Sequence, residues 1–217
     1  MPNLLTGPKL GPRIKGIIFS PSREWEAVSL EPVGVIGCFL RYVVPLAAIP
    51  PLAGLVGLVL MVSVNPGAPR TQISPLTFLP SFVIDYAASL AFVFVGAMVV
   101  SLLALVFGGR PSFSRAFKVV AYSATPFWFA GIFRLLPLSG LLPLAFSLYG
   151  LFIMYLGLPR LMRSRPDKAV AYMLTVFVIG IVINLAYSFA LLPTLLHYAP
   201  RLRPAPATAP ISGPATT

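Results

Sequence analysis

The chain has 217 residues, of which 58% are hydrophobic and only 10% are charged, and its mean hydropathy is +0.91. A soluble domain has about 45–50% apolar and about 25% charged residues, so the composition excludes a water-soluble fold and a disordered chain. Sixteen basic residues against five acidic ones give a net charge of +11. Because polar surface is scarce, this excess indicates membrane orientation rather than nucleic-acid binding. Cys38 is the only cysteine, which excludes an internal disulfide and a multi-cysteine metal site.

The charged N-terminal segment contains one clear helix signal. Ser20 followed by Pro21 is typical of a helix start, which predicts a helix over about residues 21–30. Trp25 and Val28 lie three residues apart and therefore share one face of this helix. We expect an amphipathic helix on the membrane surface, with Trp25 as an interfacial anchor at the level of the lipid headgroups. The alternative is a solvated linker helix.

Five apolar stretches follow, and each is close to the roughly 20 residues that a membrane-crossing helix needs. They predict an all-α polytopic bundle of five transmembrane helices, over about residues 39–61, 79–107, 117–136, 141–158 and 169–192. Only a short turn containing proline and glycine separates the third stretch from the fourth. A re-entrant pair in place of two full spans is therefore the alternative for residues 117–158.

The distribution of basic residues predicts the orientation of the bundle. With the N-terminus inside, eleven Lys and Arg residues lie on the cytoplasmic side and four on the outer side. The positive-inside rule therefore favours an N-in, C-out arrangement. We divide the chain into a cytoplasmic N-terminal segment (1–31), a five-span membrane domain (32–199) and a disordered tail rich in Pro, Ala and Thr (200–217).

Three polar residues fall at a similar depth in the outer half of the predicted bundle, namely Asp85, Arg134 and Asn184. Polar groups are costly in lipid, so these residues are candidates for function. They would form either an outward-facing site for a solute or a proton, or a structural ion pair of Asp85 with Arg134 and an interhelical contact through Asn184. We favour the structural interpretation, because one acidic residue is weak support for a transport pathway.

Motifs of enzyme families are absent from the sequence. It holds no HExxH, GxSxG, Walker or GxGxxG pattern. The only histidine, His197, lies at the outer end of the last predicted span, and the spans offer only Asp85 as a metal ligand. We therefore expect no catalytic activity, no bound metal and no cofactor.

Several short motifs occur in a characteristic order. The segments SPSREWE (20–26) and AFKVVAYSATP (116–126) are followed by Tyr149-Gly150 and by YLGLP (155–159). Over about residues 14–190, this order and spacing resembles the bacterial Yip family of integral membrane proteins, which is of the Ypt/Rab-interacting-protein type. The positions that carry the resemblance include Tyr122, Pro126, Tyr149, Gly150, Gly157 and Pro159. Gly150 and Gly157 share one helix face, which indicates either close helix contact or a hinge.

The resemblance implies five spans, a cytoplasmic N-terminus and no catalytic residues. Eukaryotic members of the family act in vesicle traffic and associate with prenylated small GTPases. The N-terminal region of this chain is only about thirty residues long, which is too short for a folded partner-binding domain, so we do not carry the GTPase role over. We expect a multi-pass protein of the bacterial inner membrane that acts as a scaffold or adaptor in membrane organisation or a trafficking-like role.

The expected partners are the lipid bilayer, anionic lipids at the basic cytoplasmic face, and a membrane-protein partner or a second copy of the chain, but not nucleic acid. The alternative function is a small-solute or ion transporter or channel that uses the polar layer around Asp85. An adaptor predicts Asp85 paired in a closed bundle, whereas a transporter predicts a hydrated cavity that reaches Asp85.

Overall fold

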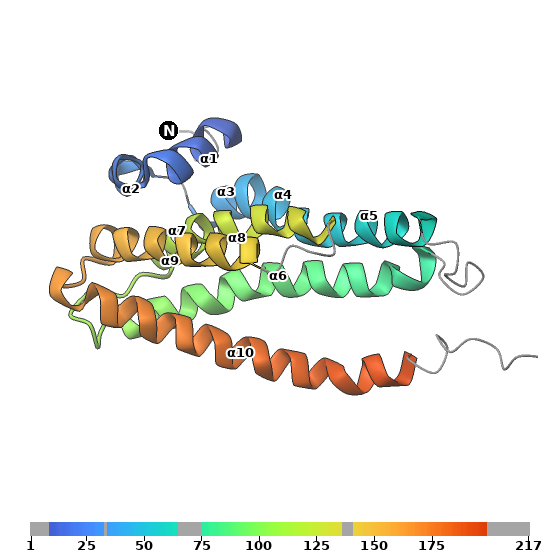
Figure 1. Ribbon diagram of the computed structural model, residues 1–217. Coiled ribbons are helices and arrows are strands. Elements are labelled where there is room, and N and C mark those ends of the chain that lie inside the picture. Colours follow the sequence, from blue (N-terminus) through green and yellow to red (C-terminus); the bar gives the residue numbers. More distant parts are fainter. Residues whose placement is uncertain (1–8, 33, 65–74, 136–140, 199–217) are drawn as a thin grey trace, which may run out of the picture.

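A computed structural model describes residues 9–32, 34–64, 75–135 and 141–198, and within these ranges the chain is helical without any strand (Figure 1). The predicted tail at 200–217 lies outside the described residues. The α-helices are α1 (Leu10–Phe19), α2 (Pro21–Leu30), α3 (Val35–Cys38), α4 (Val44–Ala47), α5 (Ile49–Val64), α6 (Pro75–Leu103), α7 (Phe113–Ser123), α8 (Thr125–Ala130), α9 (Leu141–Met162) and α10 (Ala169–Tyr198). The π-helical segment η1 (Phe39–Val43) and the 3₁₀ segments η2 (Gly131–Leu135) and η3 (Pro166–Lys168) lie between them.

Five helical segments of the described chain are long and apolar enough to cross a membrane, which confirms the predicted all-α five-span bundle. They are Val35–Leu60, Phe82–Leu103, Phe113–Phe133, Leu144–Met162 and Pro166–Leu191. Many large apolar side chains on the outside of these segments are exposed, as a bundle surrounded by lipid requires. The N-in, C-out orientation stays a prediction.

The first span is built from four short segments because prolines interrupt it. Proline has no amide hydrogen and removes a hydrogen bond from the helical ladder. The π-helical turn η1 precedes Pro45, and α5 begins just before Pro50. The Tyr86 hydroxyl of α6 donates a hydrogen bond to the Val44 carbonyl oxygen at 2.9 Å. The neighbouring span therefore supplies a donor at the interruption, as helices within a bilayer require.

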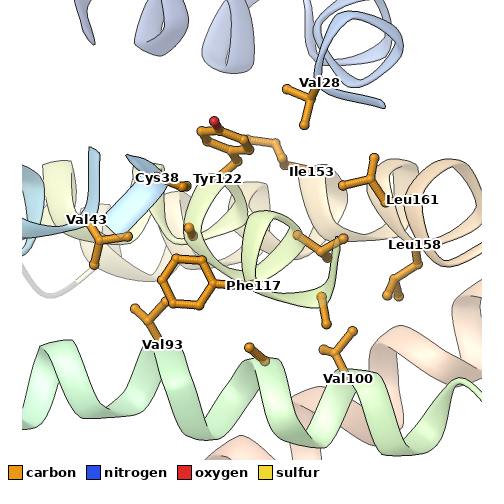
Figure 2. Packing of buried hydrophobic residues seen from close by; sticks show 14 of the residues in the cluster. Val28, Cys38, Val43, Val93, Val100, Phe117, Tyr122, Ile153, Leu158 and Leu161 are labelled. Carbon is orange, nitrogen blue, oxygen red and sulfur yellow. The ribbon is translucent and has the colours of Figure 1, made fainter. Parts of the chain in front are cut away.

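The third span, made of α7, α8 and η2, forms the centre of the bundle. In its apolar window 61% of the residues are buried, against 17% in the second and fifth spans. Phe117 points toward Val93 of α6, whereas Tyr122 points the other way, toward the N-terminal helices (Figure 2). Pro126 lies in the first turn of α8, where a missing amide hydrogen is tolerated. Trp128 is buried in the bundle and does not belong to an aromatic belt.

Helices α1 and α2, which we call the N-terminal pair, lie together against α8 and α9 on one side of the bundle (Figure 1). Helix α2 coincides with the helix predicted over residues 21–30, with Pro21 in its first turn. Helix α1 is not predicted from the sequence, because Gly11, Pro12 and Gly16 are poor helix formers. Packing overrides this weak propensity, since Ile17 is fully buried in the core that the pair shares with the bundle.

Candidate functional site

Trp25 of α2 lies inside the protein. Its side chain is 0% exposed, and its Nε1 donates a hydrogen bond to the carbonyl oxygen of Ile153 in α9 at 3.0 Å. Its ring meets the ring of Tyr122 edge-on, with 6.0 Å between the centroids. The sequence predicts a ring directed at lipid headgroups, whereas in the structure α9 covers it. The apolar face of α2 is correctly identified by its spacing, but the spacing does not reveal what the face packs against. The depth of the pair in the bilayer stays a prediction.

Two glycines of α9 allow this close packing. A β-carbon at Gly157 would lie 2.6 Å from a ring carbon of Trp25. A β-carbon at Gly150 would lie 2.8 Å from the carbonyl oxygen of Ser123, at the end of α7. Both distances are shorter than a van der Waals contact, so a larger residue would force the helices apart. The two glycines therefore mark close helix contacts.

Arg13 of α1 is a buried charge with two carboxylate partners. Its side chain is 2% exposed and forms ion pairs with Glu24 of α2 and with Glu31, the residue after α2. The central carbon of its guanidinium group also lies 5.5 Å from the centre of the Tyr122 ring, which is a cation–π contact. A buried charge is tolerated only when it is paired. These contacts therefore hold both helices of the N-terminal pair together and against α7.

Two further hydrogen bonds join the N-terminal segment to the bundle. The Lys118 Nζ of α7 donates to the backbone oxygen of Glu31 at 2.9 Å. The Tyr149 hydroxyl of α9 donates to the backbone oxygen of Ile18 in α1. We call the whole set of contacts the docking network, and its members are Arg13, Glu24, Trp25, Glu31, Lys118, Tyr122, Tyr149 and Gly157.

The docking network includes half of the positions that carry the family resemblance. Tyr122, Tyr149 and Gly157 contact the N-terminal pair directly. The other three serve the bundle itself: Gly150 contacts α7, Pro126 is buried at the start of α8, and Pro159 lies within α9. Sequence reasoning treats Arg13 and Lys118 only as orientation charges. The role of Lys118 could have been suspected from its position inside the apolar run AFKVV, because a charged residue within such a run needs a polar partner.

A cavity of about 460 Å³ lies beside the docking network, between the end of α2, the start of α7 and the end of α9. We call it the basic cavity, because four basic side chains and one acidic side chain line it together with three serines: Arg115, Lys118, Arg160, Arg163, Glu31, Ser29, Ser112 and Ser114. The three arginines are exposed, whereas Lys118 is buried. This composition concentrates positive potential in a concave site, which favours anions.

The three polar residues predicted to share a layer lie on different elements. Asp85 is exposed on α6 and Asn184 is exposed on α10. Residue Arg134 belongs to η2, which packs against α5, but its side chain is outside the described part of the structure. The Asp85–Arg134 pair and the polar layer therefore stay predictions. Among the described residues, no three His, Cys, Asp or Glu side chains are grouped so that they could hold a metal ion.

An all-helical chain with five membrane-crossing segments and a helical pair docked on them is a multi-pass membrane protein. The family model of the Yip1 domain matches residues 15–196, and the chain belongs to this family. It is 27% identical over 191 residues to the Inner membrane protein YohC of Escherichia coli strain K12, and equally to YohC of strain O6:H1 (CFT073). Each alignment covers 86% of this chain and 97% of the relative. No solved structure matches. The predicted Yip family and the predicted multi-pass location in a bacterial inner membrane are confirmed.

Proposed function

We propose that this protein is a non-enzymatic scaffold or adaptor of the inner membrane, and that the N-terminal pair is the part that meets its partner. The supporting observation is the docking network, in which a buried tryptophan and hydrogen bonds hold the helical pair on the bundle, while partly buried ion pairs join the two helices to each other. Helices that are fixed before binding lose little conformational entropy when a partner binds. A short N-terminal region can therefore serve as a recognition surface without being a folded domain of its own.

The outer surface of the N-terminal pair has the composition of a contact surface. Phe19 is 76% exposed and Leu30 is 85% exposed, at the ends of α1 and α2. Charged side chains of the same two helices are also exposed, including Lys15, Arg23 and Glu26. Large apolar side chains framed by charged ones are typical of surfaces that bind proteins or membranes.

The transporter alternative requires a polar cavity that reaches Asp85. The basic cavity is a different site, since α2, α7 and α9 line it and Asp85 does not. Asp85 lies on an exposed side of α6. An adaptor role requires no such pathway.

Site-specific photo-crosslinking in intact bacterial membranes, followed by mass spectrometry, tests the adaptor role. The crosslinker replaces Arg23, which is exposed on α2, and in a matched control it replaces Val182, which is exposed on α10. We expect one dominant protein partner from the Arg23 position, absent from the Val182 position and lost when Trp25→Ala releases the pair. Capture of the same proteins from both positions would contradict the proposal.

A further inference from the structure

The basic cavity holds an excess of positive charge that the protein does not neutralise. Its basic side chains come from the start of α7 and the end of α9, and they are Arg115, Lys118, Arg160 and Arg163. In the part of the chain that the structure describes, none of these four forms an ion pair with a carboxylate, whereas Arg13 and Arg165 each do. The cavity therefore gathers four basic side chains against one carboxylate, that of Glu31.

The contacts inside the cavity use neutral acceptors. Glu31 is the acidic residue of the lining, but its carboxylate pairs with Arg13. Lys118 donates to the backbone oxygen of Glu31, and Arg160 donates to the backbone oxygen of Leu156 in its own helix at 3.0 Å. Four like charges around one concave site repel one another, and a bound anion would relieve this repulsion.

The start of α7 adds uncharged donors to the same site. Ser112 is the N-cap residue of α7 and makes no side-chain capping hydrogen bond, while the hydroxyl-bearing residues Ser112 and Ser114 both line the cavity. The first amide groups of a helix have no acceptor within the helix, and its N-terminus carries a partial positive charge. Phosphate groups bind at such helix starts.

The end of α9 contributes an arginine in an unusual conformation. Arg163 has a φ of 54°, in the left-handed region that residues other than glycine rarely adopt. The amide of Arg110 donates to the carbonyl oxygen of Met162 at 2.7 Å, so this turn is tied to the segment that leads into α7. A strained position that would suit glycine is thus occupied by an arginine that lines the cavity.

We infer that the basic cavity binds a phosphate group, carried either by an anionic lipid headgroup or by a free phosphate compound. Arginine side chains bind phosphate oxygens through paired N–H donors, and the cavity offers three of them with a lysine and a helix start. Its volume of about 460 Å³ lies within the roughly 300–1,000 Å³ of small-molecule sites and leaves room for a group attached to the phosphate. This ligand site goes beyond the adaptor role and does not depend on it.

The test uses the full-length protein, purified in a neutral detergent and freed of lipid. The probes are inorganic phosphate and phosphatidylglycerol, with phosphatidylcholine as the lipid of no net charge, and binding is followed by native mass spectrometry and thermal shift. The cavity variant is Arg115→Gln/Arg160→Gln, which removes two exposed arginines of the lining. The matched control is Lys15→Gln/Arg23→Gln, which removes two exposed basic residues that do not line the cavity.

At constant ionic strength we expect the wild type to bind one equivalent of phosphate or phosphatidylglycerol in preference to phosphatidylcholine. The cavity variant should bind about tenfold more weakly or worse, because two charge-assisted hydrogen bonds are lost. The affinity of the control variant should stay within about twofold of the wild-type affinity, because the charges that it removes are exposed and lie outside the cavity. Saturable binding of inorganic phosphate identifies a free phosphate compound as the source. If inorganic phosphate does not displace bound phosphatidylglycerol, the lipid headgroup is identified as the source of the phosphate group.

The inference is wrong if the wild type binds neither probe. It is also wrong if the control variant loses as much affinity as the cavity variant, because binding would then follow net charge and not the cavity. Both results come from purified protein, so they leave the crosslinking test of the adaptor role unaffected. A failed crosslinking experiment would equally leave phosphate binding intact.

Discussion

Replacing Gly157 with alanine should loosen the N-terminal pair in the wild type but not in a chain that lacks the Trp25 ring. The added β-carbon would lie 2.6 Å and 2.7 Å from two ring carbons of Trp25. Overpacking of this kind costs about 1–3 kcal/mol. Alanine in place of glycine also favours the helix by about 1 kcal/mol, so the net effect in the wild type is destabilising by up to about 2 kcal/mol.

In a Trp25→Ala background, Gly157→Ala should stabilise the protein instead of destabilising it. Removing the fully buried ring costs about 3–5 kcal/mol of docking stability. Once the ring is gone, the new methyl group meets no obstacle and only the gain in helix propensity remains. The double variant should therefore be more stable than the sum of the single changes by about 1–3 kcal/mol. Gly180→Ala on α10 is the control, since nothing lies within 4 Å of its β-carbon position.

Tryptic cleavage at Lys15 and Arg23, which are both exposed on the N-terminal pair, measures the docking equilibrium in detergent. Cleavage of a transiently opened segment follows the population of the open state. Trp25→Ala should raise the cleavage rate by more than about 100-fold, or to the limit set by the open chain, and Gly157→Ala should raise it by a smaller factor. Equal destabilisation by Gly157→Ala in both backgrounds would show that the ring is not what the glycine accommodates.

Three further predictions use other parts of the chain. A reporter active only in the periplasm should be active when fused after Pro200 and inactive when fused at Arg163; an inactive C-terminal fusion would contradict the N-in, C-out arrangement. Asp85→Asn and Arg134→Gln should each lower thermal stability in detergent, with partial recovery in the double variant, and simple additivity would mean that the two side chains do not touch. Arg13→Gln leaves two partly buried carboxylates without their cation and should destabilise the N-terminal pair by less than the about 3–5 kcal/mol of a fully buried ion pair; unchanged tryptic cleavage would refute the role of these two ion pairs.

The five spans could be predicted because each rests on many apolar residues in a row, so the signal is local and large. Helix α2 could be predicted from Ser20 and Pro21 for the same reason, since a helix start depends on neighbours in sequence. Helix α1 could not, because its stability comes from burial of residues such as Ile17 and not from its own propensity.

The candidate site depends on contacts between distant segments. The Trp25 ring is matched to a glycine of α9, and no local pattern connects the two positions. Counting basic residues predicts that Arg115 and Arg160 share one side of the membrane, but it does not reveal that the start of α7 and the end of α9 enclose a cavity. Such a juxtaposition is a property of the tertiary structure.

The docking of the N-terminal pair also imposes an order in time on the synthesis of the chain. Trp25 and the Ile153 carbonyl that accepts its hydrogen bond are 128 positions apart. At roughly 5–20 residues per second, α9 leaves the ribosome about 6–25 s after the helices that it will hold. During this interval the ring of Trp25 lacks the surface that finally buries it. A chain that ends before its fourth span would therefore keep this ring without its cover and without the acceptor for its N–H group.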